Sequence, residues 1–398
     1  MDPIKPQPFK FRHVVAMPWP GRGHINPMMN LCKRLVRRDP NLHVTYVVTE
    51  EWLGFIGSDP KPHQIHFSTL PNLIPSELVR AKITTRWRTY PLTDTNRWRL
   101  NGHKSRAESK EDEIVDYIPG LSPTRLRDLS EIFHGYVYQS FIKFKPCYDD
   151  ISKANYLLFP STYELEPIAI DFFTSKFRFP VYSTGPLIPF QELNDGEKPD
   201  YIRWLDEQPE GSVLYISQGS FLSVTEAQME EIMEGVRDSG VRFLWVARGL
   251  DSRLKEALEG SLGVVVSWCD QLRVLCHAAV GGFWTHCGYN STLEGMYSGV
   301  PMLTFPLVWD QFLNAKMIVE EWRIGMRMKS KKSTAEMLIR RDEVKELVKR
   351  FMDGESEEGK GMRRRACDLS EICRGAVAKA GSSDVNIDAF IKDITMIV

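Results

Sequence analysis

The sequence lacks a long apolar run, and no stretch approaches the roughly eighteen residues that a membrane-spanning helix needs. The first ten residues are polar and include three prolines, so we expect neither a signal peptide nor a membrane anchor. Cysteine is scarce and scattered, with seven residues and no Cys-x-x-Cys pair, which is unlike the disulfide framework of a secreted protein. These absences predict a cytoplasmic protein.

The chain also lacks an excess of charge of either sign. It carries 51 basic and 52 acidic residues, for a formal net charge of -1. This balance disfavours a nucleic-acid-binding protein with a basic surface, and it also disfavours an acidic disordered tail. With 398 residues, 42% of them hydrophobic, the chain is long enough for two domains, each with its own core.

Strand and helix patterns alternate along most of the chain. The first patterns are an apolar run at 13–18, a glycine-containing turn at 21–27, a helical spacing over 28–37 and a β-branched strand at 43–48. The alternation continues in the second half of the chain, over 212–304. Alternation of this kind predicts an α/β fold with parallel sheets wrapped by helices. We expect two Rossmann-like domains.

The boundaries of these domains follow from a polar, strand-free linker. We expect the first domain at 1–190 and the second at 200–383. A short amphipathic helix at 384–398 is expected to pack back across the junction. The stretch 82–110 fits neither pattern, because it holds eight basic residues and neither helical nor alternating periodicity. We interpret it as a solvated loop or a segment foreign to the fold, and an RNA-binding arm is the alternative.

A loop in the second domain has the features of an anion site. The sequence His286-Cys-Gly-Tyr-Asn-Ser291 opens a predicted helix, so the backbone N–H groups of Asn290 and Ser291 would point out of the helix start. A phosphate group would be favoured there by these donors, by the helix dipole and by His286.

Other polar and aromatic residues fit the rest of a sugar nucleotide. Glu294 can accept hydrogen bonds from a ribose diol, and Trp268 offers a flat face for a base. Asp310 and Gln311 follow another apolar strand and offer acceptors and donors for sugar hydroxyls. In a doubly wound sheet, all of these residues would lie at the carboxyl ends of strands, where ligands bind.

The spacing of these residues resembles a known family signature. Trp268 stands forty-three positions before Gln311, as in the plant secondary-product glycosyltransferase box. The residues in register with the box are Gln271, His286, Gly288, Asn290, Ser291, Glu294, Pro301, Asp310 and Gln311. The chain therefore resembles a plant family 1 UDP-glycosyltransferase of the GT-B fold, which implies that its two Rossmann-like domains face each other across a cleft. Within that family it resembles the 87A group, which shares the Trp268-Cys269 opening.

The resemblance implies a role for each residue of the box. Trp268 would stack on uracil, Gln271 and the Cys269 backbone would hold that base, and Glu294 would bind the ribose. The diphosphate would be bound in the segment around Gly288, by His286, Asn290 and Ser291, and also by Ser220. Asp310 and Gln311 would bind the sugar, and a glutamine at this last position goes with glucose. Tyr289 replaces the tryptophan that is usual in the family.

A second resemblance concerns the N-terminal turn, Gly21-Arg-Gly-His-Ile-Asn-Pro27. It implies that His24 is the general base, because a neutral imidazole is available near pH 7. The family orients this base with an aspartate from a strand of the N-terminal domain. By comparison that domain is truncated here by roughly sixty residues, about two βαβ-sized pieces, and the aspartate should lie in the lost part. Asp94 is the candidate replacement.

The expected activity is the transfer of glucose from UDP-glucose to a hydroxyl of a small lipophilic acceptor, with inversion. We expect no metal or other cofactor, no nucleic-acid or membrane partner, and a monomer. The first alternative is a UDP-sugar-binding protein that is catalytically impaired because the segment carrying the aspartate is missing. The second is a nicotinamide-dependent oxidoreductase built on the Gly21-Arg-Gly23 turn, although the third glycine of that fingerprint is absent.

Overall fold

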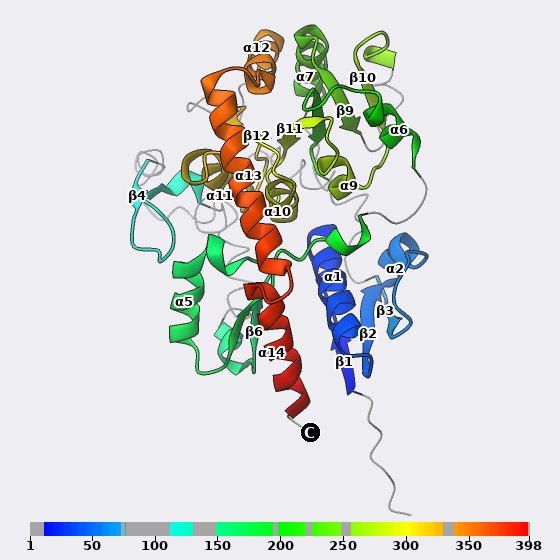
Figure 1. The fold of residues 1–398 in the computed structure, drawn as a ribbon, viewed down its shortest axis with the longest axis vertical. Helices are drawn as coiled ribbons and strands as arrows, with labels where there is room; N and C mark the ends of the chain where they lie inside the picture. The colour runs from blue at the N-terminus through cyan, green and yellow to red at the C-terminus, as the bar shows by residue number, and fades with distance from the viewer. Residues whose placement is uncertain are drawn as a thin grey trace, which may run out of the picture.

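The computed structural model describes residues 12–72, 76, 112–129, 149–193, 198–219, 225–247, 256–328 and 338–396. Figure 1 shows two α/β units, one above the other, that are joined by a linker and by the C-terminal helices. Asp94, Ser220 and the stretch 82–110 lie outside the described residues.

The N-terminal half begins with a three-stranded parallel sheet in the order β1-β2-β3. Its elements are β1 (Arg12–Ala16), α1 (Arg22–Arg38), β2 (Leu42–Thr49), α2 (Glu50–Ile56) and β3 (Ile65–Leu70). Along β2 every second side chain is buried, which is the pattern of a strand with one face against a core. That core includes Tyr46 and Trp52, and the Tyr46 hydroxyl donates to the Ile25 carbonyl of α1 at 2.6 Å.

The start of α1 differs from the sequence prediction. The helix begins at Arg22 rather than at residue 28, so it contains Pro27. Proline has no N–H, and the carbonyl of Gly23, four residues earlier, therefore receives no helical hydrogen bond from it. Asn290 of the C-terminal half supplies one instead, from Nδ2 at 2.9 Å. The predicted turn at 21–27 is thus largely the beginning of α1, with His24 in its first turn.

The rest of the N-terminal half consists of shorter pieces. A two-stranded parallel sheet is formed by β6 (Leu157–Phe159) and β7 (Val181–Ser183), with α5 (Pro167–Lys176) between them in the chain. An antiparallel pair is formed by β4 (Ile114–Val115) and β5 (Thr124–Arg125). Short 3-10 turns lie at Leu126–Asp128, Asp150–Lys153, Tyr163–Leu165 and Phe190–Glu192. Among the described residues, the parallel strands of this half therefore form two separate sheets.

The C-terminal half is built on one six-stranded parallel sheet in the order β10-β9-β8-β11-β12-β13. The strands are β8 (Val213–Ser217), β9 (Arg242–Val246), β10 (Gly263–Val266), β11 (Val280–Thr285), β12 (Met302–Thr304) and β13 (Gly325–Arg327). The chain runs outward from β8 to β10 and then returns to β11 beside β8, which is the doubly wound order. Buried clusters lie on both faces of this sheet.

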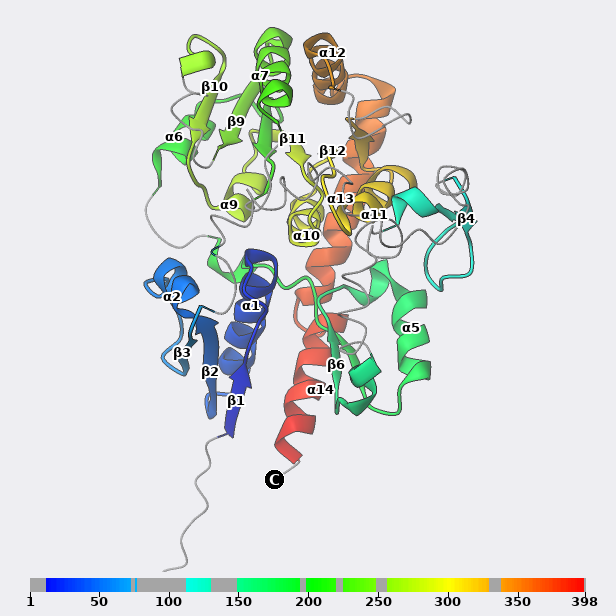
Figure 2. The same ribbon diagram turned by 180° about the vertical axis from the view of Figure 1, so that it is seen from behind.

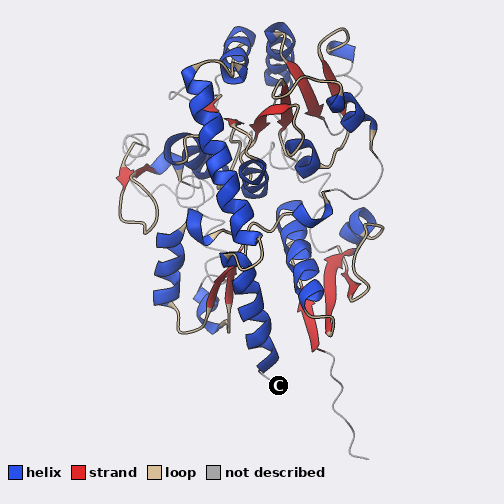
Figure 3. Ribbon diagram, in the orientation of Figure 1, coloured by secondary structure: helices blue, strands red, loops and turns tan. Residues whose placement is uncertain are grey.

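Helices cover this sheet, as the blue and red colouring of Figure 3 makes plain. They are α6 (Asp200–Asp206), α7 (Glu226–Ser239), α9 (Gln271–Leu275), α10 (Tyr289–Ser298), α11 (Gln311–Lys316), α12 (Arg341–Met352) and α13 (Glu357–Val377), and the chain ends with α14 (Ser382–Met396). A π-helical turn at Met317–Glu321 follows α11. No helix in these described segments is long and apolar enough to cross a membrane.

The last helix, α14, belongs spatially to the N-terminal half. Figures 1 and 2 both show α14 between α1 and β6. Its Ile387 is part of the N-terminal core, and Arg38 of α1 donates to Asp388 at 3.0 Å. The Tyr182 hydroxyl donates to Asp393. The described chain therefore starts in the N-terminal half, forms the C-terminal half, and returns to the N-terminal half with α14. This return connects the two halves.

Candidate functional site

The switch point of the C-terminal sheet lies between β8 and β11, because the connections from these neighbouring strands run to opposite sides of the sheet. Ligands of doubly wound sheets bind there, outside the carboxyl ends of the strands. Gly219, with φ 82°, follows β8, and a Cβ atom on it would lie 2.7 Å from His286 Nε2. A Cβ on Gly288, which follows β11, would lie 2.5 Å from the same atom. Both glycines therefore allow their loops to close on the imidazole.

The imidazole of His286 is enclosed by these loops. Burial lowers the pKa of His286 to about 4, so the ring is neutral at physiological pH. A backbone hydrogen bond with Ser217 opposes part of this decrease, and the buried Nδ1 atom has no partner at hydrogen-bonding distance and angle among the described residues. Buried polar atoms in folded proteins are nearly always paired, so this atom marks a place where a ligand would complete the hydrogen bonding.

Helix α10 begins next to His286. Its cap residue Gly288 has no side chain that could accept from the first-turn amides, and the first bond inside the helix runs from the Thr292 amide to the Gly288 carbonyl at 2.9 Å. The N–H groups of Tyr289, Asn290 and Ser291 therefore have no acceptor within α10. Three such donors and the helix dipole favour an anionic ligand at this point.

Side chains from three elements form a hydrogen-bonded network beside this helix start. Gln271 Nε2 donates to Ser291 Oγ at 3.0 Å and also to the carboxyl of Glu294. The amide oxygen of Gln271 accepts from the Tyr215 hydroxyl at 3.2 Å, and Cys269 Sγ lies 3.3 Å from that hydroxyl. The network brings together residues that the sequence analysis assigns to the base, the ribose and the diphosphate. Tyr215, which the sequence did not single out, connects them.

Glu294, which belongs to this network, and Trp268, which immediately precedes Cys269, offer different chemistry. Burial raises the pKa of the Glu294 carboxyl to about 7, and the hydrogen bond from Gln271 offsets only part of that rise. Trp268 lies in the loop between β10 and α9 and is 56% exposed. An indole that is exposed beside a hydrogen-bonding cluster has a face available for a flat ligand group.

Asp310 lies in the loop that follows β12. Its side chain is exposed, and Asn314 Nδ2 donates to Asp310 Oδ2 and to the carbonyl of Cys287, both at 2.9 Å. Cys287 and Trp309 have φ values of 65° and 56°. Non-glycine residues in this left-handed region are uncommon and concentrate at functional sites. No pattern in the sequence indicates these left-handed residues. Asn314 was not predicted because its side chain bonds to groups in two different loops, the Cys287 carbonyl and the Asp310 carboxylate.

Gln311, the last residue of the predicted box, is buried. Its amide oxygen accepts hydrogen bonds from the backbone N–H groups of Leu307 and Val308, at 2.8 and 3.1 Å. This oxygen therefore holds the loop that presents Asp310. A direct contact between Gln311 and a sugar stays a prediction, and its amide nitrogen is the atom that would make it.

His24 reaches the same region from the N-terminal half. Burial lowers the pKa of His24, and the negative charge of Asp310 opposes that decrease. The two side chains, one from each half, thus lie close enough to influence each other's ionisation. In the described part of the chain, no carboxylate accepts a hydrogen bond from the His24 ring. The predicted partner Asp94 and the predicted phosphate ligand Ser220 lie outside the described residues.

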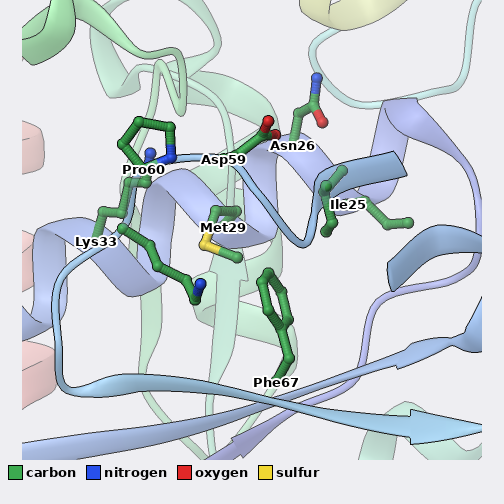
Figure 4. Close-up of a pocket in the computed structure, with 9 residues that line it drawn as sticks. Ile25, Asn26, Met29, Lys33, Asp59, Pro60 and Phe67 are labelled. Carbon is green, nitrogen blue, oxygen red and sulfur yellow. The ribbon is translucent and has the colours of Figure 1, made fainter. Parts of the chain in front are cut away.

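A separate pocket lies between α1 and β3. Figure 4 shows Met29 and Lys33 of α1 near Phe67 of β3, with Asp59 and Pro60 closing one side. Every residue that lines this pocket belongs to the N-terminal half, so it is distinct from the site at the switch point.

The architecture defines a class of protein. Two Rossmann-like halves that face each other, with an anion-binding helix start at the switch point of the second half, form the GT-B fold. The structure of Phytolacca americana UGT2 complexed with UDP-2fluoro-glucose and pterostilbene matches with a TM-score of 0.78 and 25% identity, over 96% of this chain and 100% of that one. A UDP-glucosyltransferase from Polygonum tinctorium matches with a TM-score of 0.77 and 26% identity, over 97% and 99%. The predicted fold is confirmed.

Sequence comparison then gives the family. The family model "UDP-glucoronosyl and UDP-glucosyl transferase" matches residues 195–355. UDP-glycosyltransferase 87A1 of Arabidopsis thaliana is 66% identical over 442 positions, which cover 96% of this chain and all of the relative. UDP-glycosyltransferase 87A2 of the same plant is 63% identical, over 99% of both chains. The chain belongs to the plant family 1 UDP-glycosyltransferases and resembles the 87A group, as the sequence box indicates.

The alignment with the 87A1 relative also measures a difference in length. It spans 442 positions, whereas 96% of 398 residues supplies about 382 of them, so about 60 positions have no counterpart in this chain. This number agrees with the shortfall of roughly sixty residues that the sequence analysis infers from two βαβ-sized pieces.

Proposed function

We propose that this chain transfers glucose from UDP-glucose to a hydroxyl group of a small lipophilic acceptor, with inversion at the anomeric carbon. The observation that carries the proposal is the start of α10, where amides that have no acceptor within the helix stand beside the buried ring of His286. The Phytolacca americana relative was solved with UDP-2fluoro-glucose and the small molecule pterostilbene, which supports the same two kinds of substrate here.

The donor would be held along the network described above. Uracil would stack on the exposed face of Trp268, the ribose hydroxyls would donate to Glu294, and the diphosphate would accept from the α10 amides and His286. Asp310 would accept hydrogen bonds from the glucose hydroxyls. The amides and the neutral imidazole are fixed before the reaction, so they stabilise the charge that develops on UDP as it leaves.

His24 would act as the general base. Its lowered pKa keeps the imidazole neutral at cytoplasmic pH, so it can accept the proton of the acceptor hydroxyl. The acceptor oxygen attacks C1 of glucose from the face opposite UDP, the C1–O bond to UDP breaks, and a β-glucoside and UDP result. General base catalysis of this kind contributes about 10² to 10⁴ in rate.

We also propose that the reaction needs no metal ion or further cofactor, because backbone amides and His286 supply the charge stabilisation that a metal would otherwise provide. A monomer in the cytoplasm is part of the same proposal.

The alternative is a chain that binds UDP-sugars but turns them over poorly. It is favoured by the absence of about 60 aligned positions and by a His24 ring that no carboxylate among the described residues orients. Without a carboxylate to orient its ring, His24 would lose much of the rate that general base catalysis contributes. The donor site in the C-terminal half would remain.

One assay separates these two functions. UDP release from UDP-glucose is measured with a panel of phenolic and alcoholic acceptors, for the wild type and for His24→Ala. The proposed transferase releases UDP only when an acceptor is present and loses at least about 100-fold in rate on substitution. Equal, slow hydrolysis in both proteins would favour the impaired chain instead.

A further inference from the structure

The two halves of the protein meet in several places, and the first turn of α10 is one of them. Two consecutive residues of that turn form hydrogen bonds to the N-terminal half. Asn290 Nδ2 donates to the Gly23 carbonyl at 2.9 Å, and the Tyr289 hydroxyl donates to Glu166 Oε2 at 3.1 Å. The same turn carries the backbone amides proposed to bind the diphosphate. Its position therefore affects both the diphosphate site and the contacts with the N-terminal half.

The hydrogen bond from Asn290 reaches the residue next to His24, the proposed general base. The Gly23 carbonyl is the group left without a helical donor by Pro27, and Gly23 immediately precedes His24. The side-chain amide of Asn290 is thus used to hold α1, which leaves its backbone N–H for the diphosphate. Any shift of the α10 turn would therefore change the distance between the diphosphate site and His24.

The hydrogen bond from Tyr289 to Glu166 joins two groups whose surroundings favour it. Burial, with the neighbouring Glu166, raises the pKa of the Tyr289 hydroxyl far above its usual value, so it stays a donor. Its ring packs against the C-terminal core. Glu166 stands at the cap position of α5 but does not cap that helix, and Ser161 Oγ donates to the same Oε2 atom. The Glu166 carboxylate therefore serves the junction of the halves rather than its own helix.

We propose that Tyr289 is a positioning residue for donor binding, which acts by fixing the first turn of α10 against the N-terminal half through Glu166. This inference rests on the proposed function, since it assigns a support to the proposed diphosphate site. In the donor arrangement proposed above, Trp268, Gln271 and Glu294 hold the base and the ribose, so the effect of Tyr289 should be confined to the diphosphate, which the α10 turn contacts.

The experiment compares UDP with uridine, which lacks the diphosphate. Binding of each ligand is measured by calorimetry for the wild type, Tyr289→Phe, Glu166→Ala and the double variant. We expect Tyr289→Phe to weaken UDP binding by about 3- to 10-fold, the range for the loss of one ordinary hydrogen bond, and to change uridine binding by less than about twofold. The double variant should bind UDP no more weakly than Glu166→Ala alone, because Glu166→Ala already removes the hydrogen bond that Tyr289→Phe breaks.

Tyr163→Phe is the matched control. The Tyr163 hydroxyl also donates to a carboxylate, that of Asp171 at 3.3 Å, but this bond stays within the N-terminal half. The control should bind UDP and uridine like the wild type. The inference is overturned if Tyr289→Phe binds UDP normally, if UDP and uridine weaken equally, or if Tyr163→Phe has the same effect. A wild-type protein that binds no UDP would overturn the proposed function itself, and this inference with it.

Discussion

Glu294 should reduce the stability of the protein at neutral and alkaline pH, because its ionised form is unfavourable in the folded state. Burial raises the pKa of this carboxyl from 4.5 to about 7. As pH increases from 4.5 to 7, the unfolded chain loses the Glu294 proton first, so the free energy of unfolding decreases. Above pH 7 both states are ionised, and the loss stays constant.

The magnitude follows from the size of that rise. At about 1.4 kcal/mol for each tenfold change in the ionisation constant, a rise from 4.5 to about 7 corresponds to about 3 kcal/mol. The side chain keeps some solvent exposure, so this figure is a ceiling. Glu294→Gln removes the titration and keeps an oxygen that can accept from Gln271. We expect the variant to be more stable than the wild type by up to about 3 kcal/mol at pH 8, and nearly equal to it at pH 4.5.

Urea denaturation followed by tryptophan fluorescence at pH 4.5, 6 and 8 would test this. Glu358→Gln, which changes an exposed carboxylate paired with Arg350, is the control and should change stability by less than about 1 kcal/mol at each pH. A Glu294→Gln protein that is less stable than the wild type at pH 8, or a difference that does not grow with pH, would refute the reasoning. The variant should also bind UDP more weakly, because a carboxylate accepts hydrogen bonds from hydroxyls more strongly than an amide does.

Three further outcomes are expected. Trp268→Ala should weaken UDP binding by about 10-fold, because base stacking on an aromatic ring is worth about 1–3 kcal/mol, and calorimetry that finds equal affinity would contradict the stacking role. Lys316 is 2% exposed and bonds to Glu321 at 2.6 Å and Ser122 at 2.7 Å, so Lys316→Ala should cost about 3 kcal/mol in urea denaturation. Arg350→Ala, which removes an exposed pair, should cost less than about 1 kcal/mol, and a similar loss in both would refute the argument from burial. Glucosyl transfer should continue in the presence of EDTA, and a loss that added Mg²⁺ restores would contradict a reaction without metal.

The sheet of the C-terminal half could be predicted because its signals are local. Strands such as Val213–Ser217 and Arg242–Val246 are short apolar runs between turn residues, and α7 has a helical period. The box from Trp268 to Gln311 is also a matter of spacing along the chain, so its identification required no contact between distant residues.

The features that could not be predicted depend on contacts with residues that the local sequence pattern does not reveal. The beginning of α1 was placed too late because Pro27 indicates a helix boundary, whereas Asn290 compensates the carbonyl that the proline leaves free. Gln311 was assigned to the sugar from the resemblance, and its hydrogen bonds to its own loop depend on a turn conformation that the sequence does not encode in any simple pattern. Tyr289 and Glu166 are 123 positions apart, so only the fold brings them together.

The central claim is that the C-terminal half holds a UDP-sugar site at the start of α10, and direct titration tests it. Calorimetry with UDP is performed on the wild type and on Glu294→Ala, in the absence and presence of NADH. We predict one UDP bound per chain, at least about tenfold weaker binding in Glu294→Ala, and no effect of NADH. Absence of UDP binding, or displacement of UDP by NADH, would contradict the account.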